Sequence, residues 1–110
     1  MKELTKAEEI LLLSILRLQK KAYGVAIKKE IQQSTGRAFA YGTLYFILEQ
    51  LSNKGFVTKE KGNPTPERGG RSKTFYKLTD KGFNTLKSSF EMHQKAWKGF
   101  AGIKWKEIGK

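Results

Sequence analysis

Cationic side chains dominate the reactive groups of this sequence. Its 110 residues include 22 lysines and arginines against 10 aspartates and glutamates, so the formal net charge is +12. A charge this large on a small chain indicates a polyanionic partner, because it far exceeds what solubility requires. The cations are spread along the chain and gather in one loop, whereas a membrane-surface helix carries them on one face. The composition therefore favours nucleic acid, with no membrane partner.

Residue types suited to catalysis or metal binding are scarce. The chain has no cysteine and one histidine, His93, so thiolate metal sites and cysteine nucleophiles are excluded. A serine nucleophile would have to be built on His93, for which no acidic partner is evident. The phosphate-binding motifs G-x-G-x-x-G and G-x-x-x-x-G-K-[ST] do not occur. We therefore expect no enzymatic activity, no cofactor and no metal.

The sequence carries no targeting or membrane signal. Its start, Met-Lys-Glu-Leu-Thr, lacks the basic-then-apolar layout of a signal peptide. No apolar run approaches the length of a membrane span. The lack of cysteine fits a reducing compartment. We expect a cytoplasmic, nucleoid-associated protein whose length suffices for one domain.

The segment 39–57 contains the helix expected to position the residues that contact a nucleic acid. Its apolar stripe, at spacings of three and four, is Tyr41, Leu44, Tyr45, Leu48 and Leu51. The opposite face, mostly small or polar, is Gly42, Thr43, Phe46, Glu49, Gln50 and Asn53. Gly55 follows, and a left-handed glycine commonly ends a helix. We predict a recognition helix over about residues 40–54.

A first helix is predicted to begin at Thr5, where Thr5 and Glu8 form a capping-box pair ahead of the apolar run 10–18. The apolar side chains of this run point in nearly every direction around the helix axis. A helix that is apolar all round is covered on both sides. One side is expected to face the domain core and the other a second subunit, through Leu12 and Ile15.

A second helix is predicted from Tyr23 to about Ser34, closed by Thr35-Gly36. Its predicted inward residues are Val25, Ala26, Ile27 and Ile31. Two short helices joined by a tight connection, the second with a polar outer face, form a helix-turn-helix. On its own the pattern also fits helical hairpins that bind nothing.

A basic hairpin follows the predicted recognition helix. The runs 56–61 and 73–78 mix charged and apolar residues roughly in alternation, which indicates two paired strands. Between them lie both prolines of the chain and three glycines, so this segment is predicted to project as a loop. Residues 59–77 carry six cations against two anions. Beside a recognition helix such a hairpin is a wing; the alternative is a solvated loop that happens to be basic.

The last helix is predicted to begin at the N-cap Thr79, with Asp80 in its first turn. Its largely aromatic stripe at helical spacing is Phe83, Leu86, Phe90, His93, Trp97 and Phe100. We expect this stripe to pair with its symmetry mate in an isologous homodimer. The alternative role of Phe90, His93 and Trp97 is to bind a small aromatic or hydrophobic effector, although such stripes more often form an interface core.

Over about residues 4–90 the chain resembles the PadR-like transcriptional regulators. The resemblance rests on Tyr23-Gly24, Gly42-Thr-Leu-Tyr45 with Leu48 and Leu51, Lys54-Gly-Phe-Val57, Gly70-Arg-Ser-Lys-Thr-Phe-Tyr76 and Leu78-Thr-Asp-Lys-Gly82. One departure is Leu51-Ser52, because many relatives place an acidic residue after that leucine. The resemblance implies a winged-helix homodimer that binds an operator and represses, often released by a small molecule held between aromatic residues at the dimer interface.

The residues expected to contact DNA come from three places. A recognition helix enters the major groove through its N-terminal turns, here Ala40, Tyr41, Gly42, Thr43 and Tyr45. Tyr23, at the start of the second helix, is a further expected contact. Tyr41 and Tyr45 also belong to the apolar stripe, so a packing role stays open for them, and it stays open for Tyr23 as well. In the wing, Arg68, Arg71 and Lys73 are expected to contact phosphates or the minor groove.

These observations predict a mainly α fold with a small β-hairpin (α+β). We expect a winged helix-turn-helix over residues 1–78 and a C-terminal dimerisation helix with its tail over residues 79–110, in one compact unit. The expected function is that of a dimeric, sequence-specific repressor of transcription that binds double-stranded DNA. The alternative is a winged-helix module that binds nucleic acid without promoter choice, or that binds protein.

Overall fold

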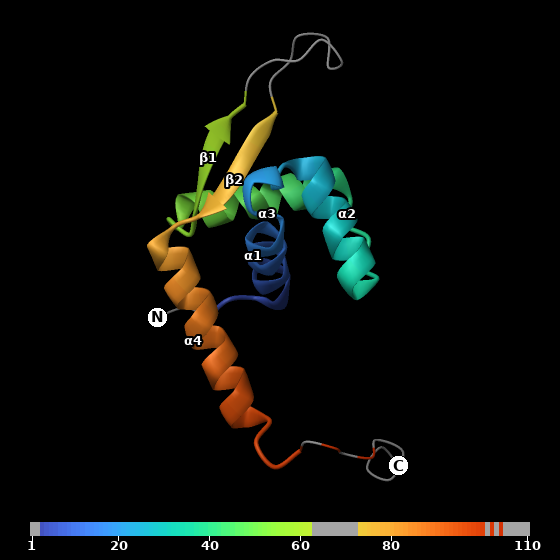
Figure 1. The fold of residues 1–110 in the computed structure, drawn as a ribbon, viewed down its shortest axis with the longest axis vertical. Coiled ribbons are helices and arrows are strands. Elements are labelled where there is room, and N and C mark those ends of the chain that lie inside the picture. The colour runs from blue at the N-terminus through green and yellow to red at the C-terminus, as the bar shows by residue number, and fades with distance from the viewer. Residues whose placement is uncertain (1–2, 63–72, 101, 103, 105–110) are drawn as a thin grey trace.

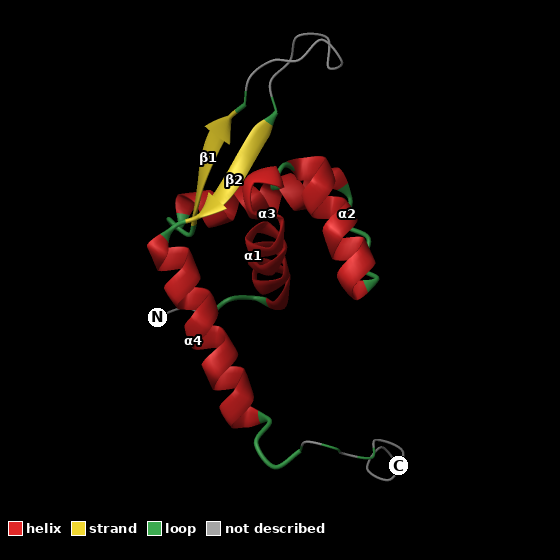
Figure 2. Cartoon of the chain, viewed as in Figure 1, coloured by secondary structure: helices red, strands yellow, loops and turns green. Residues whose placement is uncertain are grey.

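The computed structural model describes residues 3–62, 73–100, 102 and 104. Its elements are α1 (Lys6–Leu18), the 3-10 helix η1 (Gln19–Lys21), α2 (Gly24–Thr35), α3 (Tyr41–Asn53), β1 (Val57–Lys61), β2 (Thr74–Leu78) and α4 (Asp80–Ala96). Helices α1 to α3 lie together, the hairpin projects beyond them, and α4 extends away on the opposite side (Figure 1). The α+β winged helix-turn-helix expected from the sequence is confirmed, whereas η1 was not predicted (Figure 2).

One apolar cluster joins the first three helices to the hairpin. Its largest fully buried side chains are Leu11, Leu12, Ile15, Ile27, Ile31, Leu44, Leu48 and Leu51. Phe56 just before β1, Val57 at its start and Tyr76 of β2 extend the cluster beneath the hairpin. The N–H of Tyr76 donates to the carbonyl of Ala22 at 2.8 Å. The segment before α2 is therefore tied to the hairpin as well as to the core.

The buried stripe of α3 differs from the predicted one. Tyr41 and Tyr45 are 45% and 44% exposed, and Ile47 is buried in their place. A tyrosine at the edge of a stripe keeps its hydroxyl in water, since burying that group without a partner is costly. Val25 of α2 was predicted to point inward, but its side chain is 46% exposed.

Three residues assigned to the dimer interface lie instead in the core of a single chain. Leu12, Ile15 and Leu86 are at most 6% exposed, so their side chains are already covered without a partner. The spare apolar surface of α1 is formed by Leu13 and Leu16, which are 41% and 40% exposed. Successive helical residues are rotated by about 100°, so a short shift along the chain exchanges the two sides of the helix.

A buried carboxylate links the start of α1 to the end of α3. The predicted capping box is present: the N–H of Glu8 donates to Thr5 Oγ1 at 3.1 Å, and the N–H of Thr5 donates to Glu8 Oε1 at 2.9 Å. Glu8 is 3% exposed, and its second oxygen accepts a hydrogen bond from the Lys54 ammonium. Next to Lys54, Gly55 takes the predicted left-handed conformation, with φ of 80°.

The environment of Glu8 makes stability depend on pH. Burial alone raises the pKa of Glu8, but hydrogen bonds from Lys54 and the Thr5 backbone, with the charge of Lys54, lower it below its ordinary range. A depressed folded-state pKa stabilises the fold above the unfolded pKa of about 4.3, and this contribution is lost as the pH falls through the folded value. We expect Glu8→Gln to lower the free energy of unfolding at pH 7 by about 1–2 kcal/mol.

Urea unfolding at pH 7 and pH 3.5 checks this prediction. Glu8→Gln is expected to flatten the acid dependence, because the variant has no proton to bind at this position. The exposed Glu91 provides the control substitution Glu91→Gln, which should leave the pH dependence as in the parent chain. Equal pH dependence in the parent and Glu8→Gln would contradict the assigned role of Glu8.

The hairpin is antiparallel, with Val57 opposite Leu78 and Lys61 opposite Thr74. The predicted strands are therefore correct to within a residue. All of the predicted wing loop 62–72 except Gly62 lies outside the described part of the chain, and Arg68 and Arg71 lie there too.

Helix α4 begins as predicted, since Thr79 Oγ1 accepts the N–H of Gly82 at 3.0 Å. The same hydroxyl donates to the carbonyl of Gly55 at 2.6 Å, which fixes the direction in which α4 leaves the hairpin. The helix ends at Ala96, and Gly99 has a φ of 89°. Phe100 therefore lies beyond the helix and does not continue the predicted stripe in helical register.

Candidate nucleic-acid interface

The first turns of α3 present an open surface. Ala40 is the N-cap residue and makes no side-chain cap hydrogen bond. Gly42 and Thr43 are exposed, and a Cβ added at Gly42 would meet nothing within 4 Å. The fold itself therefore does not require a glycine at position 42.

Two tyrosines line one edge of this surface. The rings of Tyr41 and Tyr45 stack with their centroids 6.2 Å apart and an interplanar angle of 22°. The Lys28 ammonium lies 5.3 Å from the centroid of the Tyr41 ring and also donates to the carbonyl of Phe39. Two phenol hydroxyls and a cation are thus held beside the start of α3. Lys28 was not among the residues predicted to contact DNA.

Close packing at the start of α2 holds Tyr45 in place. A Cβ at Gly24 would lie 1.9 Å from the Tyr45 hydroxyl oxygen, so glycine is needed there for the phenol to cross the helix. Burial, with the neighbouring Tyr45 and Glu49, raises the pKa of Tyr76 beneath this edge. Tyr76 therefore stays neutral at physiological pH and adds no charge to the surface.

Tyr23 connects α2 to the base of the wing. Its ring meets Phe75 edge-on at a centroid distance of 5.7 Å, and the two residues form an isolated antiparallel bridge. The Lys73 ammonium lies 4.1 Å from the centroid of the Tyr23 ring, within the range of a cation–π contact. Of the three wing cations predicted to contact DNA, Lys73 is the one that the structure describes, and its ammonium lies over the Tyr23 ring.

The two readings of Tyr23, packing residue or phosphate clamp, are separable by substitution. Tyr23→Phe keeps the ring under Lys73 and removes only the hydroxyl, so we expect DNA affinity to change by less than about twofold. Tyr23→Leu removes the cation–π contact, so we expect it to weaken DNA affinity by about threefold to tenfold. Fluorescence anisotropy with a labelled duplex measures both. An equal loss for the two variants would instead show that the hydroxyl binds a phosphate.

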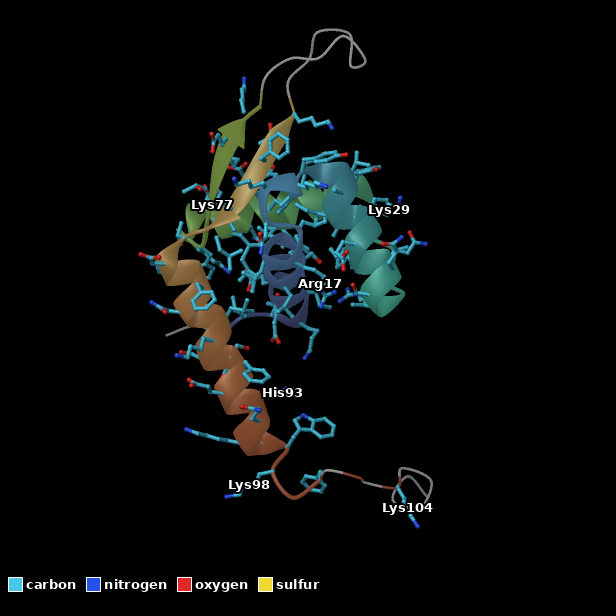
Figure 3. The ribbon with its side chains drawn as sticks, in the orientation of Figure 1. Arg17, Lys29, Lys77, His93, Lys98 and Lys104 are labelled. Atoms are coloured by element: carbon cyan, nitrogen blue, oxygen red, sulfur yellow. The ribbon has the colours of Figure 1, made fainter. Side chains whose placement is uncertain are left out.

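The acidic residue nearest the middle of α3 is paired. Glu49 accepts hydrogen bonds from Lys59 of β1 at 2.9 and 3.2 Å, so its negative charge is partly neutralised. This exposed pair contributes little to stability. Further cations lie around the domain, with Lys29 on α2 and Lys77 on β2 (Figure 3). Arg17 lies between α1 and α2, where it pairs with Glu30 at 2.8 Å.

The predicted effector residues lie on the part of α4 that extends away from the other helices. His93 and Trp97 are in tilted contact, with ring centroids 5.7 Å apart, and His93 is labelled on this extension in Figure 3. Phe90 and Trp97 are 57% and 45% exposed. Across the described ranges, no group of three or more histidine or acidic side chains is placed to hold a metal ion.

A groove of about 750 Å³ lies between the end of α1, the hairpin and the start of α4. Its apolar lining residues are Ile15, Leu16, Phe75, Tyr76, Leu78 and Phe83. Leu16 and Phe83 are 40% and 48% exposed. The groove joins the spare surface of α1 to the first exposed aromatic residue of α4.

The chain matches the transcriptional regulator PadR-like family over residues 12–88, more than half of its length. It belongs to that family. A PadR family transcription regulator from Clostridium difficile R20291 is 30% identical, with a TM-score of 0.63 over 86% of this chain and 98% of that one. The chain is thus a DNA-binding transcriptional regulator of the PadR-like type. No curated protein matches it.

Other solved structures share the PadR-like fold. The structure titled as the complex of hsRosR-S4 is 28% identical, with a TM-score of 0.67 over 89% of this chain and 77% of that one. A PadR family regulator from Eggerthella lenta DSM 2243 has a TM-score of 0.67 over 88% of this chain and 82% of that one, and at 23% identity it supports the fold alone. None of the helices in the described ranges is long and apolar enough to cross a membrane.

Proposed function

We propose that this PadR-like protein is a homodimeric, sequence-specific repressor that acts in the cytoplasm on nucleoid DNA. In this proposal α3 enters the major groove through its N-terminal turns, and the wing contacts the backbone or the minor groove. The observation that carries it is the open, exposed surface of Gly42 and Thr43 at the start of α3. A tyrosine and lysine edge borders this surface on one side.

The proposed contacts are of two kinds: contacts to base edges, which select the DNA sequence, and contacts to the phosphate backbone, which position the protein on the duplex. Thr43 offers a hydroxyl to a base edge or a phosphate, Gly42 and Ala40 permit close approach, and the phenols of Tyr41 and Tyr45 reach the backbone. Lys73, with Arg68 and Arg71 of the loop, supplies affinity that does not depend on base sequence.

The exposed apolar surface supports a dimer. Its residues on α4 and the following turn are Phe83, Phe90, Trp97 and Phe100, and those on α1 are Leu13 and Leu16. A monomer rarely leaves so many large apolar side chains in water, and such a patch commonly marks an association surface. In an isologous pair, α4 of one chain packs along α4 of the other, and its aromatic residues approach the partner's groove beside α1.

A small hydrophobic effector is part of the proposal. Phe90, His93 and Trp97 are exposed, and the rings of His93 and Trp97 are in contact. Two such sets facing each other across the dimer axis would bind a flat apolar molecule. Quenching of tryptophan fluorescence by planar aromatic compounds, lost in Trp97→Leu but retained in Trp105→Leu, tests this role. Equal quenching in the two variants would place the effector elsewhere.

Selection of duplexes from a random pool, followed by competition with bulk DNA, tests the function. A repressor is expected to recover a pseudo-palindromic consensus and to prefer it over bulk DNA by about a thousandfold or more. Several phosphate contacts per dimer also predict a steep loss of affinity as salt rises. Equal binding to all duplexes would favour the alternative, a winged-helix module without promoter choice.

Gly42→Ala separates DNA contact from folding. The added methyl group meets nothing in the protein, and alanine is the better helix former, so the free energy of unfolding should stay unchanged or rise by up to about 1 kcal/mol. Operator affinity should nevertheless fall by about tenfold, because the methyl group holds the helix away from the groove floor. Asn53→Ala, at the far end of the outer face, is the control and should leave affinity unchanged. Unaltered affinity in Gly42→Ala would exclude close approach at this residue.

A further inference from the structure

An apolar side chain stands at the centre of the surface proposed to face DNA. Phe46 is 61% exposed, the highest value among the large hydrophobic side chains in the described part of the chain. It lies about 160° around α3 from the buried Leu44, so it points away from the core. Most of the other exposed large apolar residues belong to the surface that a second subunit is proposed to cover, which comprises Leu13, Leu16, Phe83, Phe90, Trp97 and Phe100. That subunit does not account for Phe46.

Phe46 lies in the second turn of α3, among the N-terminal turns proposed to enter the major groove. It is the sixth residue of the helix, which places its Cα about 7.5 Å along the axis from the first. Gly42 and Thr43 precede it by four and three residues, so the three share one face. A helical side chain leans toward the N-terminal end of its helix, and on that side the space at Gly42 is empty.

The major groove offers an apolar partner for this ring. Its floor is largely polar, and the exception is the 5-methyl group of thymine, which apolar side chains such as phenylalanine recognise by contact. We propose that Phe46 reads thymine through this methyl group and gives the operator a thymine preference at one position of each half-site. The inference rests on the proposed function, since it requires α3 to lie in the groove.

The surroundings of Phe46 favour DNA over a protein partner. Its neighbours on the outer face, Gly42, Thr43, Glu49 and Gln50, are exposed and either small or polar. A protein interface of ordinary size buries about 800 Å² on each partner and has an apolar centre, whereas one ring is sufficient to cover one methyl group. The pairing of Glu49 with Lys59 at 2.9 Å also reduces the negative charge beside the ring, as approach to a phosphate backbone requires.

Replacing thymine by uracil tests the contact directly, because uracil lacks only the 5-methyl group and keeps its base pairing. Duplexes are first selected from a random pool by the full chain, and each thymine of the consensus is then replaced in turn. At one position of each half-site we expect uracil to weaken binding of the parent chain by about fourfold. Phe46→Ala should bind the thymine and uracil duplexes alike, and Phe46→Leu should retain part of the preference.

Each outcome of this experiment bears on the inference. A consensus that is insensitive to uracil at every position, or full discrimination by Phe46→Ala, would overturn the inference alone. A pool that yields no consensus would overturn the proposed function and the inference with it. If Phe46→Ala binds no duplex, Phe46→Leu carries the comparison: a reduced preference for thymine supports the contact, and an unchanged one overturns it. Circular dichroism confirms that each variant is folded.

Discussion

Replacing Gly82 with alanine is expected to lower the free energy of unfolding by about 3 kcal/mol. Gly82 lies in the first turn of α4 and is buried. A Cβ added there would lie 2.1 Å from the carbonyl oxygen of Phe56 and 2.9 Å from its carbonyl carbon. Because the obstacle is backbone, it cannot turn aside as a side chain would. The start of α4 must therefore move away from Phe56, which also breaks the hydrogen bonds that Thr79 donates to the carbonyls of Phe56 and Gly55.

Gly42→Ala is the matched control for this experiment, since both glycines lie in the first turn of a helix and only Gly82 is packed against backbone. Urea denaturation followed by circular dichroism measures both variants. The difference between them isolates the steric term, because the gain in helix propensity is common to both. A Gly82→Ala variant as stable as the parent would mean that the start of α4 is not held against the Phe56 backbone as described.

Phe90→Asp is expected to separate the proposed dimer and to reduce operator affinity by about a hundredfold. The 57% exposed ring lies on the aromatic face of α4, and an isologous interface places each substitution twice, so two carboxylates would enter one apolar contact. Once the subunits separate, each half-site is bound independently, and the gain from linking two binding sites is lost. Sedimentation equilibrium and fluorescence anisotropy measure the two effects on one sample.

Met92→Asp provides the control for Phe90→Asp. Met92 is 48% exposed on the same helix, but two residues place it about 160° away from Phe90 around the axis. Met92→Asp introduces the same charge on the opposite face of α4, so subunit association and operator affinity should stay near the parent values. If both variants remain dimeric, or if the parent chain is itself monomeric at working concentrations, α4 is not the dimerisation element.

Contacts between α4 and the DNA-binding part suggest how an interface change would reach the DNA. Ser89 Oγ donates to Glu9 Oε1 at 3.0 Å, which links the middle of α4 to the start of α1. Thr79 fixes the root of α4 on Gly55, directly after α3. A rotation of α4 in the proposed dimer would therefore move α1 and α3 with it and change the spacing of the two α3 helices.

Local signals predicted the elements well. The capping box of Thr5 and Glu8, the left-handed Gly55 and the N-cap Thr79 depend on a few neighbouring residues, so they are readable in the sequence. The predictions were wrong where the buried face of a helix depends on packing against segments far away in the sequence. The sequence contains nothing local that puts Ile47 rather than Tyr45 in the core, or that distinguishes Leu13 from Leu12 on a helix that is apolar all round.

The amino-acid order by itself determined the winged helix-turn-helix, its basic character and the placement of the recognition helix, because charge, periodicity and capping act over a few residues. Tertiary structure alone decided which faces stay open: that Leu12, Ile15 and Leu86 are buried in the chain's own core, that Ile47 rather than Tyr45 is buried, and that Lys73 is held over Tyr23. Burial is set by contacts between segments far apart in the chain, and such contacts exist only once the helices are packed.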